Sequence, residues 1–250
     1  MQAYSSSFAK AYNTWWSGFA RQVAPDIQKF YEATAKGEIE KTLLDLCCGT
    51  GQLAVHFLQQ GYRVVGIDLS EPMLSFAKEN AREYIDAGVA TFIQADATSF
   101  TLDERFGLVT STFDALNHLA DEQALKQCFQ RVFRVCNGVF IFDLNTRLGL
   151  KRWNGVSVDD SEDALIINSG IFDSKSGKGW VKITGFIPTA DGLFERFEQT
   201  AFSTAFEMER VRELLLEIGW RQVHFARAEA LAVPIDQPET VGRVFIVAMK

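Results

Sequence analysis

The chain has 250 residues, of which 47% are hydrophobic, 23% are charged and five are proline. This is the composition of a globular protein with one or two domains, and it excludes a disordered or fibrous chain. The 32 acidic and 25 basic side chains give a net charge of −7, which argues against a nucleic-acid partner. No apolar run approaches the roughly 20 residues of a membrane span, and the first residues lack the pattern of a signal peptide. We therefore expect a cytoplasmic protein with no membrane partner.

The four cysteines predict neither a metal site nor a disulfide. Cys47 and Cys48 are adjacent, Cys128 and Cys136 stand apart, and the sequence has no Cys-x-x-Cys pair or Cys/His cluster. Zinc sites need such clusters, and a disulfide between adjacent cysteines is strained. We expect four reduced thiols and no metal.

Helical periodicity is evident in the first 40 residues. Apolar side chains recur at helical spacing from Phe19 to Phe30, and Pro25 fits the first turn of a helix. Residues 1–40 are therefore predicted to form a helical N-terminal segment.

Short apolar strands then alternate with amphipathic helices. Strands are predicted at residues 42–46, 62–67, 90–94, 106–110 and 138–144, with two more at 221–226 and 244–249. Helices are predicted at residues 52–60, 71–87, 120–135 and 207–218, the second with Ser70 as its N-cap. This alternation predicts an α/β fold in which helices cover both faces of a mostly parallel sheet.

Residues 151–205 follow a different pattern. Apolar and polar side chains alternate here, as in a strand with one buried face. Strands are predicted at residues 164–172, 179–188 and 193–202, joined by Asp-Ser-Lys-Ser-Gly and Ala-Asp-Gly turns. The segment is therefore predicted to be a small antiparallel β insert after strand five, which divides the main domain into residues 41–150 and 206–250.

The loop after the first strand is predicted to bind a nucleoside cofactor. Gly49 and Gly51 allow a sharp turn and the close approach of a ligand at the start of the next helix. Their spacing to Ala54 also fits the dinucleotide fingerprint. Asp45 separates the two interpretations, because a carboxylate at this place repels the pyrophosphate of a nicotinamide cofactor but attracts the ammonium group of S-adenosylmethionine.

Acidic side chains also follow the second and third strands. Asp68 is placed to accept hydrogen bonds from both ribose hydroxyls, with capping of the next helix as the alternative role. Met73, in the first turn of that helix, either packs on the purine or belongs to the core. Asp96 is expected to hold the adenine amine with the Ala97 N–H on a ring nitrogen, or else Asp96 caps a turn.

In this order and spacing, the motifs resemble those of class I S-adenosylmethionine-dependent methyltransferases. They are DLxCGTG from residue 45, GIDLSxxML from residue 66 and the Asp-Ala pair at residues 96–97. FAxxYN at residues 8–13, FDALNHL at 113–119, GVFIFDLNT at 138–146 and RVFIVA at 243–248 are similar to segments of small bacterial members that methylate small molecules. Sugar-amine N,N-dimethyltransferases are among these members. The resemblance covers nearly the whole chain and implies a doubly wound, Rossmann-like, seven-stranded sheet.

The resemblance also implies a site. S-adenosyl-L-methionine would be the cofactor and S-adenosyl-L-homocysteine its product, with residues 1–40 as a lid and the insert, residues 151–205, on the substrate side. The implied cofactor-binding residues are Tyr12, Asp45, Cys47, Gly49, Gly51, Asp68, Leu69, Met73, Asp96, Ala97 and Phe113. The chain departs from the family pattern at Asn13, where an acid is usual, and at His118, where Tyr is usual. These positions face the substrate in the family, so no substrate is inherited from any one relative.

His118 and Asp114 are the candidate catalytic residues. Both follow strand four, whose end lies beside the cofactor sulfur in this fold. A histidine takes up a proton near neutral pH and is therefore a candidate base, although His118 could equally be a wall residue. Asp114 is expected either to orient an amine or to cap a turn.

The main hypothesis is an in-line transfer of a methyl group to nitrogen or oxygen of a small-molecule acceptor. A NAD-dependent oxidoreductase and a non-catalytic cofactor-binding protein are the alternatives. Cofactor binding separates the first alternative from the main hypothesis, and methyl transfer separates the second. The sequence is compatible with a monomer or an oligomer.

Overall fold

The structure, a computed structural model, describes residues 4–161, 164–189 and 191–250. Residues 1–3 of the predicted N-terminal segment lie outside the described residues. So do residues 162–163 and 190 of the predicted β insert, the last of which belongs to the predicted Ala-Asp-Gly turn. No helix in the described ranges has both the length and the apolar character needed to cross a bilayer.

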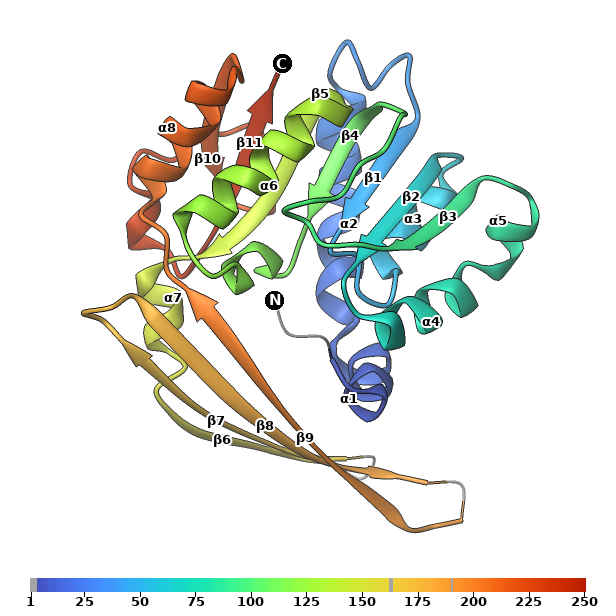
Figure 1. The fold of residues 1–250 in the computed structure, drawn as a ribbon, viewed down its shortest axis with the longest axis vertical. Coiled ribbons are helices and arrows are strands. Elements are labelled where there is room, and N and C mark those ends of the chain that lie inside the picture. The colour runs from blue at the N-terminus through green and yellow to red at the C-terminus, as the bar shows by residue number, and fades with distance from the viewer. Residues whose placement is uncertain (1–3, 162–163, 190) are drawn as a thin grey trace.

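The main sheet has seven strands in the order β10-β11-β5-β4-β1-β2-β3 (Figure 1). All neighbouring strands are parallel except that β11 runs antiparallel to both β5 and β10. The strands are β1 (Thr42–Leu46), β2 (Arg63–Asp68), β3 (Ala90–Gln94), β4 (Phe106–Ser111), β5 (Cys136–Asn145), β10 (Gln222–Ala226) and β11 (Arg243–Met249). The predicted fold class is confirmed.

Helices cover both faces of this sheet, as the apolar patterning predicts. They are α2 (Gly18–Glu32), α3 (Gln52–Gln59), α4 (Glu71–Asn80), α5 (Arg82–Asp86), α6 (Glu122–Val135) and α8 (Met208–Ile218). Leu43 of β1 packs with apolar side chains of α2, α3 and α4, whereas its neighbour Leu44 packs with those of α6 and α8. Successive strand residues therefore bury their side chains in two separate cores.

Two predicted helices differ in detail from the structure. Residues 71–87 were expected to form one helix, but the backbone leaves the helical region at Ala81 and α5 starts a new turn. The break lets Tyr84 and Ile85 pack against the core that contains Ala81. Pro25 lies inside α2 instead of its first turn. This is tolerated because Pro25 and Arg21 are exposed, so water can hydrate the Arg21 carbonyl that loses its helical hydrogen bond.

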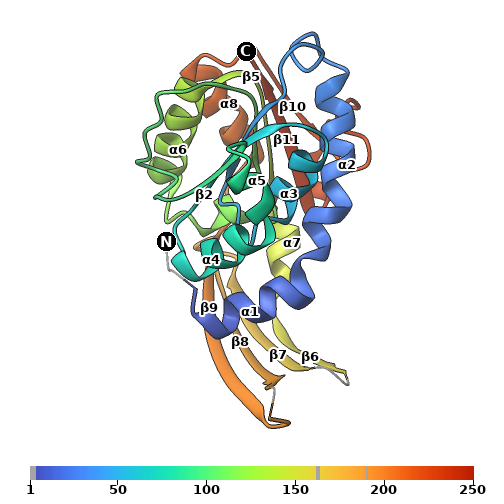
Figure 2. The same ribbon diagram turned by 90° about the vertical axis from the view of Figure 1, so that its right-hand side faces the viewer.

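The N-terminal segment is divided rather than a single helix. Helix α1 (Ser6–Ala11) passes into a π-helical turn, η1 (Tyr12–Trp16), and then into α2. Figure 2 shows α1 beside α4 and above the insert strand β9, and α1 contacts both elements.

The β insert is a four-stranded antiparallel sheet. Its strands are β6 (Gly155–Asp160), β7 (Leu165–Asp173), β8 (Lys178–Pro188) and β9 (Phe194–Thr204), and the short helix α7 (Arg147–Lys151) precedes them. Three of the strands were predicted. The edge strand β6 was missed because all its residues are exposed and Asp159 and Asp160, which are rare in strands, end it.

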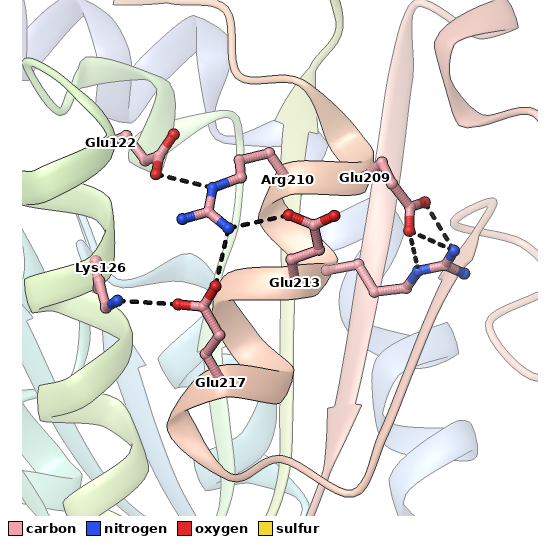
Figure 3. A network of polar contacts seen from close by, with 7 residues as sticks. Glu122, Lys126, Glu209, Arg210, Glu213 and Glu217 are labelled. Carbon is pink, nitrogen blue, oxygen red and sulfur yellow. Dashed lines mark hydrogen bonds and ion pairs between the residues drawn. The ribbon is translucent and has the colours of Figure 1, made fainter.

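The described ion pairs between α6 and α8 lie at the surface (Figure 3). Arg210 bonds to Glu122 at 2.9 Å and to Glu213 and Glu217 at 2.9 Å each, while Lys126 reaches Glu217 at 3.0 Å. Exposed pairs contribute about 0–1 kcal/mol each. The two helices are therefore held mainly by the apolar side chains they bury against the sheet.

Candidate active site

A cavity of about 670 Å³ lies between the carboxyl ends of β1, β2 and β4 and the inner face of the insert. The N-terminal segment, the glycine loop after β1, the start of α4, the loop after β4 and strands β7, β8 and β9 all contribute to its wall. Ligands of open α/β sheets bind at this edge, where the strands end and helices begin.

The structure brings most of the predicted site residues into this wall. Those that line the cavity are Tyr12, Cys47, Gly49, Asp68, Leu69, Met73, Phe113, Asp114 and His118. Those that do not are Asp45, Gly51, Asp96 and Ala97.

The glycine loop makes the sharp turn that its sequence predicts. Gly49 and Gly51 have φ values of 54° and 81°, which favour glycine. A Cβ on Gly51 would lie 3.0 Å from Cβ of Ala77, so the close crossing of α4 also requires glycine there. The ring of Tyr12 covers the other glycine, with a ring carbon 3.6 Å from the position of a Cβ on Gly49. The N-terminal segment therefore closes directly over the loop.

Asp68 connects the glycine loop to the next helix. Its Oδ2 accepts the Gly49 N–H and its Oδ1 accepts the Ser70 N–H, both at 2.9 Å. Burial raises the pKa of Asp68, and the hydrogen bonds from Ser70 and Gly49 oppose that shift. Each carboxylate oxygen can accept a second hydrogen bond. Asp68 does not cap α4, whose N-cap position is Ser70 without a side-chain capping bond, as its hydroxyl bonds to the Tyr4 carbonyl instead. The ribose role of Asp68 remains a prediction, for which its oxygens keep capacity.

Asp45 lies beneath the loop and not in the cavity wall. The residue is 2% exposed; its Oδ1 accepts a hydrogen bond from Thr110 Oγ1 at 3.1 Å, and its Oδ2 bonds to none of the described residues. Burial raises the pKa of Asp45 to about 7, with a smaller contribution from the charge of Asp68. Near neutral pH this carboxyl is therefore only partly ionised, in contrast to the fixed negative charge that the sequence suggested. Because Oδ2 is itself buried, Asp45 would act on a cation above the loop through its charge and not through direct contact.

This burial predicts a pH-dependent affinity. A ligand that carries an ammonium group selects the ionised form of Asp45, which becomes common only as the pH rises through 7. We expect the affinity for S-adenosylhomocysteine to increase about tenfold from pH 6 to pH 8. Calorimetric titration across this range measures the effect, and Asp45→Asn should flatten it. An affinity that is constant with pH in the unaltered chain would contradict the assignment.

Asp96 and Ala97 are turned away from the cavity wall. Asp96 Oδ1 accepts hydrogen bonds from the backbone N–H and the hydroxyl of Thr98 at 2.7 and 2.6 Å, so it caps a turn. Ala97 is 2% exposed and belongs to the core. The adenine role of this pair remains a prediction.

His118 lines the cavity, and each of its ring nitrogens has a hydrogen-bond partner. Its Nδ1 lies 2.6 Å from the carbonyl oxygen of Phe202, on β9. A carbonyl only accepts, so this contact assigns the ring hydrogen of the neutral imidazole to Nδ1. Nε2 then carries a lone pair, and the hydroxyl of Tyr4 lies 3.4 Å from it. The insert thus fixes the tautomer in which a histidine can accept a proton from a ligand.

Asp114 forms an ion pair at the cavity wall, and its role in orienting an amine remains a prediction. Its Oδ1 lies 2.6 Å from Nη2 of Arg243, and the same guanidinium bonds to Asp143, which is fully buried. The Asp143 carboxylate also accepts the backbone N–H groups of Phe113 and Asp114 at 2.6 and 2.9 Å. Both residues have positive φ, so the network holds a strained turn that leads to His118.

The sequence analysis missed Arg243 and Asp143 as site residues. A charged side chain inside the apolar run of strand five was the available signal, because buried acids are rare unless paired. Arg243 also lies over the rings of Phe19 and Phe113, with its central guanidinium carbon 4.7 and 5.4 Å from their centroids. Phe113 thereby links the network to the cavity.

The N-terminal segment is tied to the body of the protein by polar contacts. Asn13 Oδ1 accepts hydrogen bonds from Gln52 at 2.7 Å and Asn80 at 2.9 Å. Asn13 thus joins η1 to α3 and α4, a structural use for a residue that departs from the family pattern. The backbone N–H of Ser5 donates to Gln199 of the insert at 3.3 Å. The segment therefore bridges the main domain and the insert.

Aromatic side chains of the N-terminal segment pack together and form part of the cavity wall. Phe8 packs against Tyr4 and Trp16, with ring centroids 4.6 and 5.6 Å apart. Trp16 lines the cavity, whereas Trp15 packs against the small core formed by this segment, Met73 and the insert. Met73 is 1% exposed and belongs to this core, and it also reaches the cavity. Its packing on the purine remains a prediction.

The chain is similar to several known methyltransferases. The family described as a methyltransferase domain matches residues 43–138. A "Putative methyltransferase" of Geobacillus sp. (strain WCH70) is 30% identical over 216 residues, which cover 84% of this chain and 85% of that protein. The ubiquinone biosynthesis O-methyltransferase of Pasteurella multocida (strain Pm70) is 29% identical over 160 residues, 58% of this chain and 65% of that protein.

The chain is also similar to an N-methyltransferase in sequence and to a solved structure in fold. The dTDP-3-amino-3,4,6-trideoxy-alpha-D-glucopyranose N,N-dimethyltransferase of Streptomyces venezuelae is 28% identical over 123 residues, 49% of each chain. The crystal structure of an S-adenosylmethionine-dependent methyltransferase from Clostridium acetobutylicum ATCC 824 superposes with a TM-score of 0.79 over 97% of both chains, at 20% identity. The fold agrees with these matches, and the chain belongs to the methyltransferases.

Proposed function

We propose that the protein transfers a methyl group from S-adenosylmethionine to a nitrogen or oxygen atom of a small-molecule acceptor. The observation that carries this proposal is the setting of His118: Nδ1 is engaged by the carbonyl of Phe202, and Nε2, which accepts the hydroxyl of Tyr4 at 3.4 Å, would accept a proton once an acceptor displaces that hydroxyl. The relatives named above as O- and N-methyltransferases support both kinds of acceptor atom.

The described residues support distinct roles in this reaction. S-adenosylmethionine, when bound, supplies an electrophilic methyl group on a sulfonium. The glycine loop and Asp68 would hold its nucleoside, and the Asp45 carboxyl below the loop would favour its ammonium. The aromatic N-terminal segment keeps water from the cavity, so that positioning and desolvation supply most of the rate enhancement. His118 Nε2 would take the proton that an acceptor hydroxyl or amine releases.

The insert forms the other wall, where the acceptor would lie. Val181 and Ile183 of β8 and Ala201 of β9 line the cavity with apolar surface. The hydroxyl of Ser203, buried at 2% exposure, also belongs to this wall and has no partner among the described residues. A mainly apolar pocket with a few polar groups suits a small molecule that carries one reactive amine or hydroxyl.

Methyl transfer from labelled S-adenosylmethionine tests the proposal. The purified chain should label at least one member of a panel of small amines, phenols and carboxylic acids, and the label should be found on nitrogen or oxygen. If the chain binds S-adenosylmethionine but labels none of them, the remaining alternative of a non-catalytic binding protein replaces the proposal.

The cofactor part of the proposal predicts a large effect at Asp68. In Asp68→Asn an amide NH₂ replaces one carboxylate oxygen, so it confronts the backbone N–H of Gly49 or Ser70 as a second donor. We expect the dissociation constant for S-adenosylhomocysteine to increase about 10- to 100-fold, as calorimetry measures it. Glu71→Gln is the matched control, because Glu71 is an exposed acid of α4 paired with Lys78. Equal affinities of the two variants would contradict the assignment.

A further inference from the structure

A second hollow, the arginine groove, lies at the same edge of the main sheet as the cavity. Its wall includes Asn145, Arg152, Trp153, Arg227, Gly242 and Arg243, and its volume is about 620 Å³. Asn145 ends β5, Arg227 follows β10 and Gly242 precedes the antiparallel β11. The groove is therefore formed at the carboxyl ends of parallel strands, where open α/β sheets bind ligands.

The groove is basic in an acidic protein. Three arginines and no acidic residue line it, although acidic side chains outnumber basic ones by 32 to 25 in the chain. The charge of Arg243 is balanced by Asp114 and Asp143. Within the part of the chain that the structure describes, no ion pair joins Arg152 or Arg227 to an acid. Two uncompensated guanidinium groups beside one hollow favour a ligand with more than one negative charge.

A neutral donor completes the groove. Asn145 is 8% exposed, and its side-chain amide makes no hydrogen bond to the described residues. Buried amides are usually paired, so this one is available to a ligand. A Cβ on Gly149 would lie 1.9 Å from the Gly242 carbonyl oxygen. Glycine at position 149 therefore lets α7 pack closely against the segment before β11, and this packing holds the groove residues together.

The groove adjoins the cavity. Trp153 lines both of them, and the ion pair between Arg243 of the groove and Asp114 of the cavity lies between them. A ligand held in one is thus next to the other.

We propose that the arginine groove binds a phosphate or diphosphate group of the methyl acceptor, held by Arg152 and Arg227 with the Asn145 amide as a further donor. Guanidinium forks match phosphate oxygens in bidentate pairs. Because the inference names a part of the acceptor, it rests on the proposed function.

Binding of inorganic pyrophosphate tests the groove separately from catalysis. By calorimetry, the unaltered chain should bind pyrophosphate, and the double variant Arg152→Gln/Arg227→Gln should bind it at least about tenfold more weakly. Arg221→Gln, which removes one exposed positive charge outside the groove, should bind as the unaltered chain does. All three proteins should bind S-adenosylhomocysteine equally, which shows that they are folded. No binding by the unaltered chain, or equal binding by the double variant, overturns the proposal.

Transfer to paired acceptors tests whether the phosphate belongs to the acceptor. Each pair contains an amine or hydroxyl compound and its phosphate ester, assayed with labelled S-adenosylmethionine. We expect at least about tenfold higher kcat/KM for the phosphorylated member, and we expect the double variant to lose that preference. Equal use of both members by the unaltered chain overturns the acceptor assignment. If the chain binds pyrophosphate but methylates neither member of any pair, the result counts against the proposed function. It also counts against the groove as a site for the acceptor.

Discussion

Replacing His118 by Gln is expected to lower kcat about 10²- to 10⁴-fold, the usual contribution of a positioned base. The amide of Gln cannot take up a proton near neutral pH, although it can still bond to the Phe202 carbonyl that now holds Nδ1 at 2.6 Å. Binding of S-adenosylhomocysteine should stay within about twofold of the unaltered chain, because the glycine loop and Asp68 are untouched. The pH profile of methyl transfer should also differ between the variant and the unaltered chain, because the variant lacks this base.

His56→Gln is the matched control for this variant. His56 lies on α3, where its Nε2 is 2.8 Å from Gln28 Oε1, and it does not line the cavity. Its substitution should leave kcat and the pH profile unchanged. If His118→Gln keeps the rate and the profile of the unaltered chain, His118 is a wall residue and the transfer needs no base from the protein.

Replacing Arg243 by Met is expected to destabilise the fold by about 3–5 kcal/mol, the cost of leaving buried acids without their partner. Asp143 is fully buried and Asp114 is 7% exposed, and both bond to this one guanidinium. Chemical denaturation at pH 7 measures the loss, which corresponds to a fall in Tm of about 6–20 °C for a chain of this size.

The loss of stability in Arg243→Met should also depend on pH, which tests its cause separately. Burial raises the pKa of Asp143 and Arg243 opposes that rise, so removing Arg243 should raise the pKa further. An acid whose folded pKa is raised stabilises the fold when it is protonated, and this contribution disappears as the pH rises through the folded value. The stability difference between the two proteins should therefore shrink as the pH is lowered from 7 to 5. Arg210→Met, in the exposed pairs of Figure 3, should lower the stability far less than Arg243→Met at either pH.

The main domain could be predicted because its signals are local. Short apolar strands and capped helices alternate along residues 41–150, and the turn chemistry of Gly49 and Gly51 places the ligand edge of the sheet. Asp68 could be found in the same way, since an acid after the second strand must lie beside that loop. Its position relative to the loop follows from the parallel pairing of β1 and β2.

The parts that escaped prediction depend on contacts between distant segments. Arg243 and Asp143 are 100 residues apart, and their pairing exists only because β11 inserts beside β5 in the reverse direction. Asp45 stands in an expected place, but its burial beneath the loop and its raised pKa follow from the packing of β1 against β4. The tautomer of His118 likewise depends on a carbonyl of the insert, 84 residues away in the sequence.

A crystal structure of the protein with S-adenosylhomocysteine is the most direct test of the account. We expect the ribose hydroxyls of the ligand to bind the Asp68 carboxylate and its amino group to lie above Asp45. Its sulfur should face His118 Nε2, with space for an acceptor against the insert. A nucleoside bound away from Asp68, or a sulfur directed away from His118 and the insert, would contradict it.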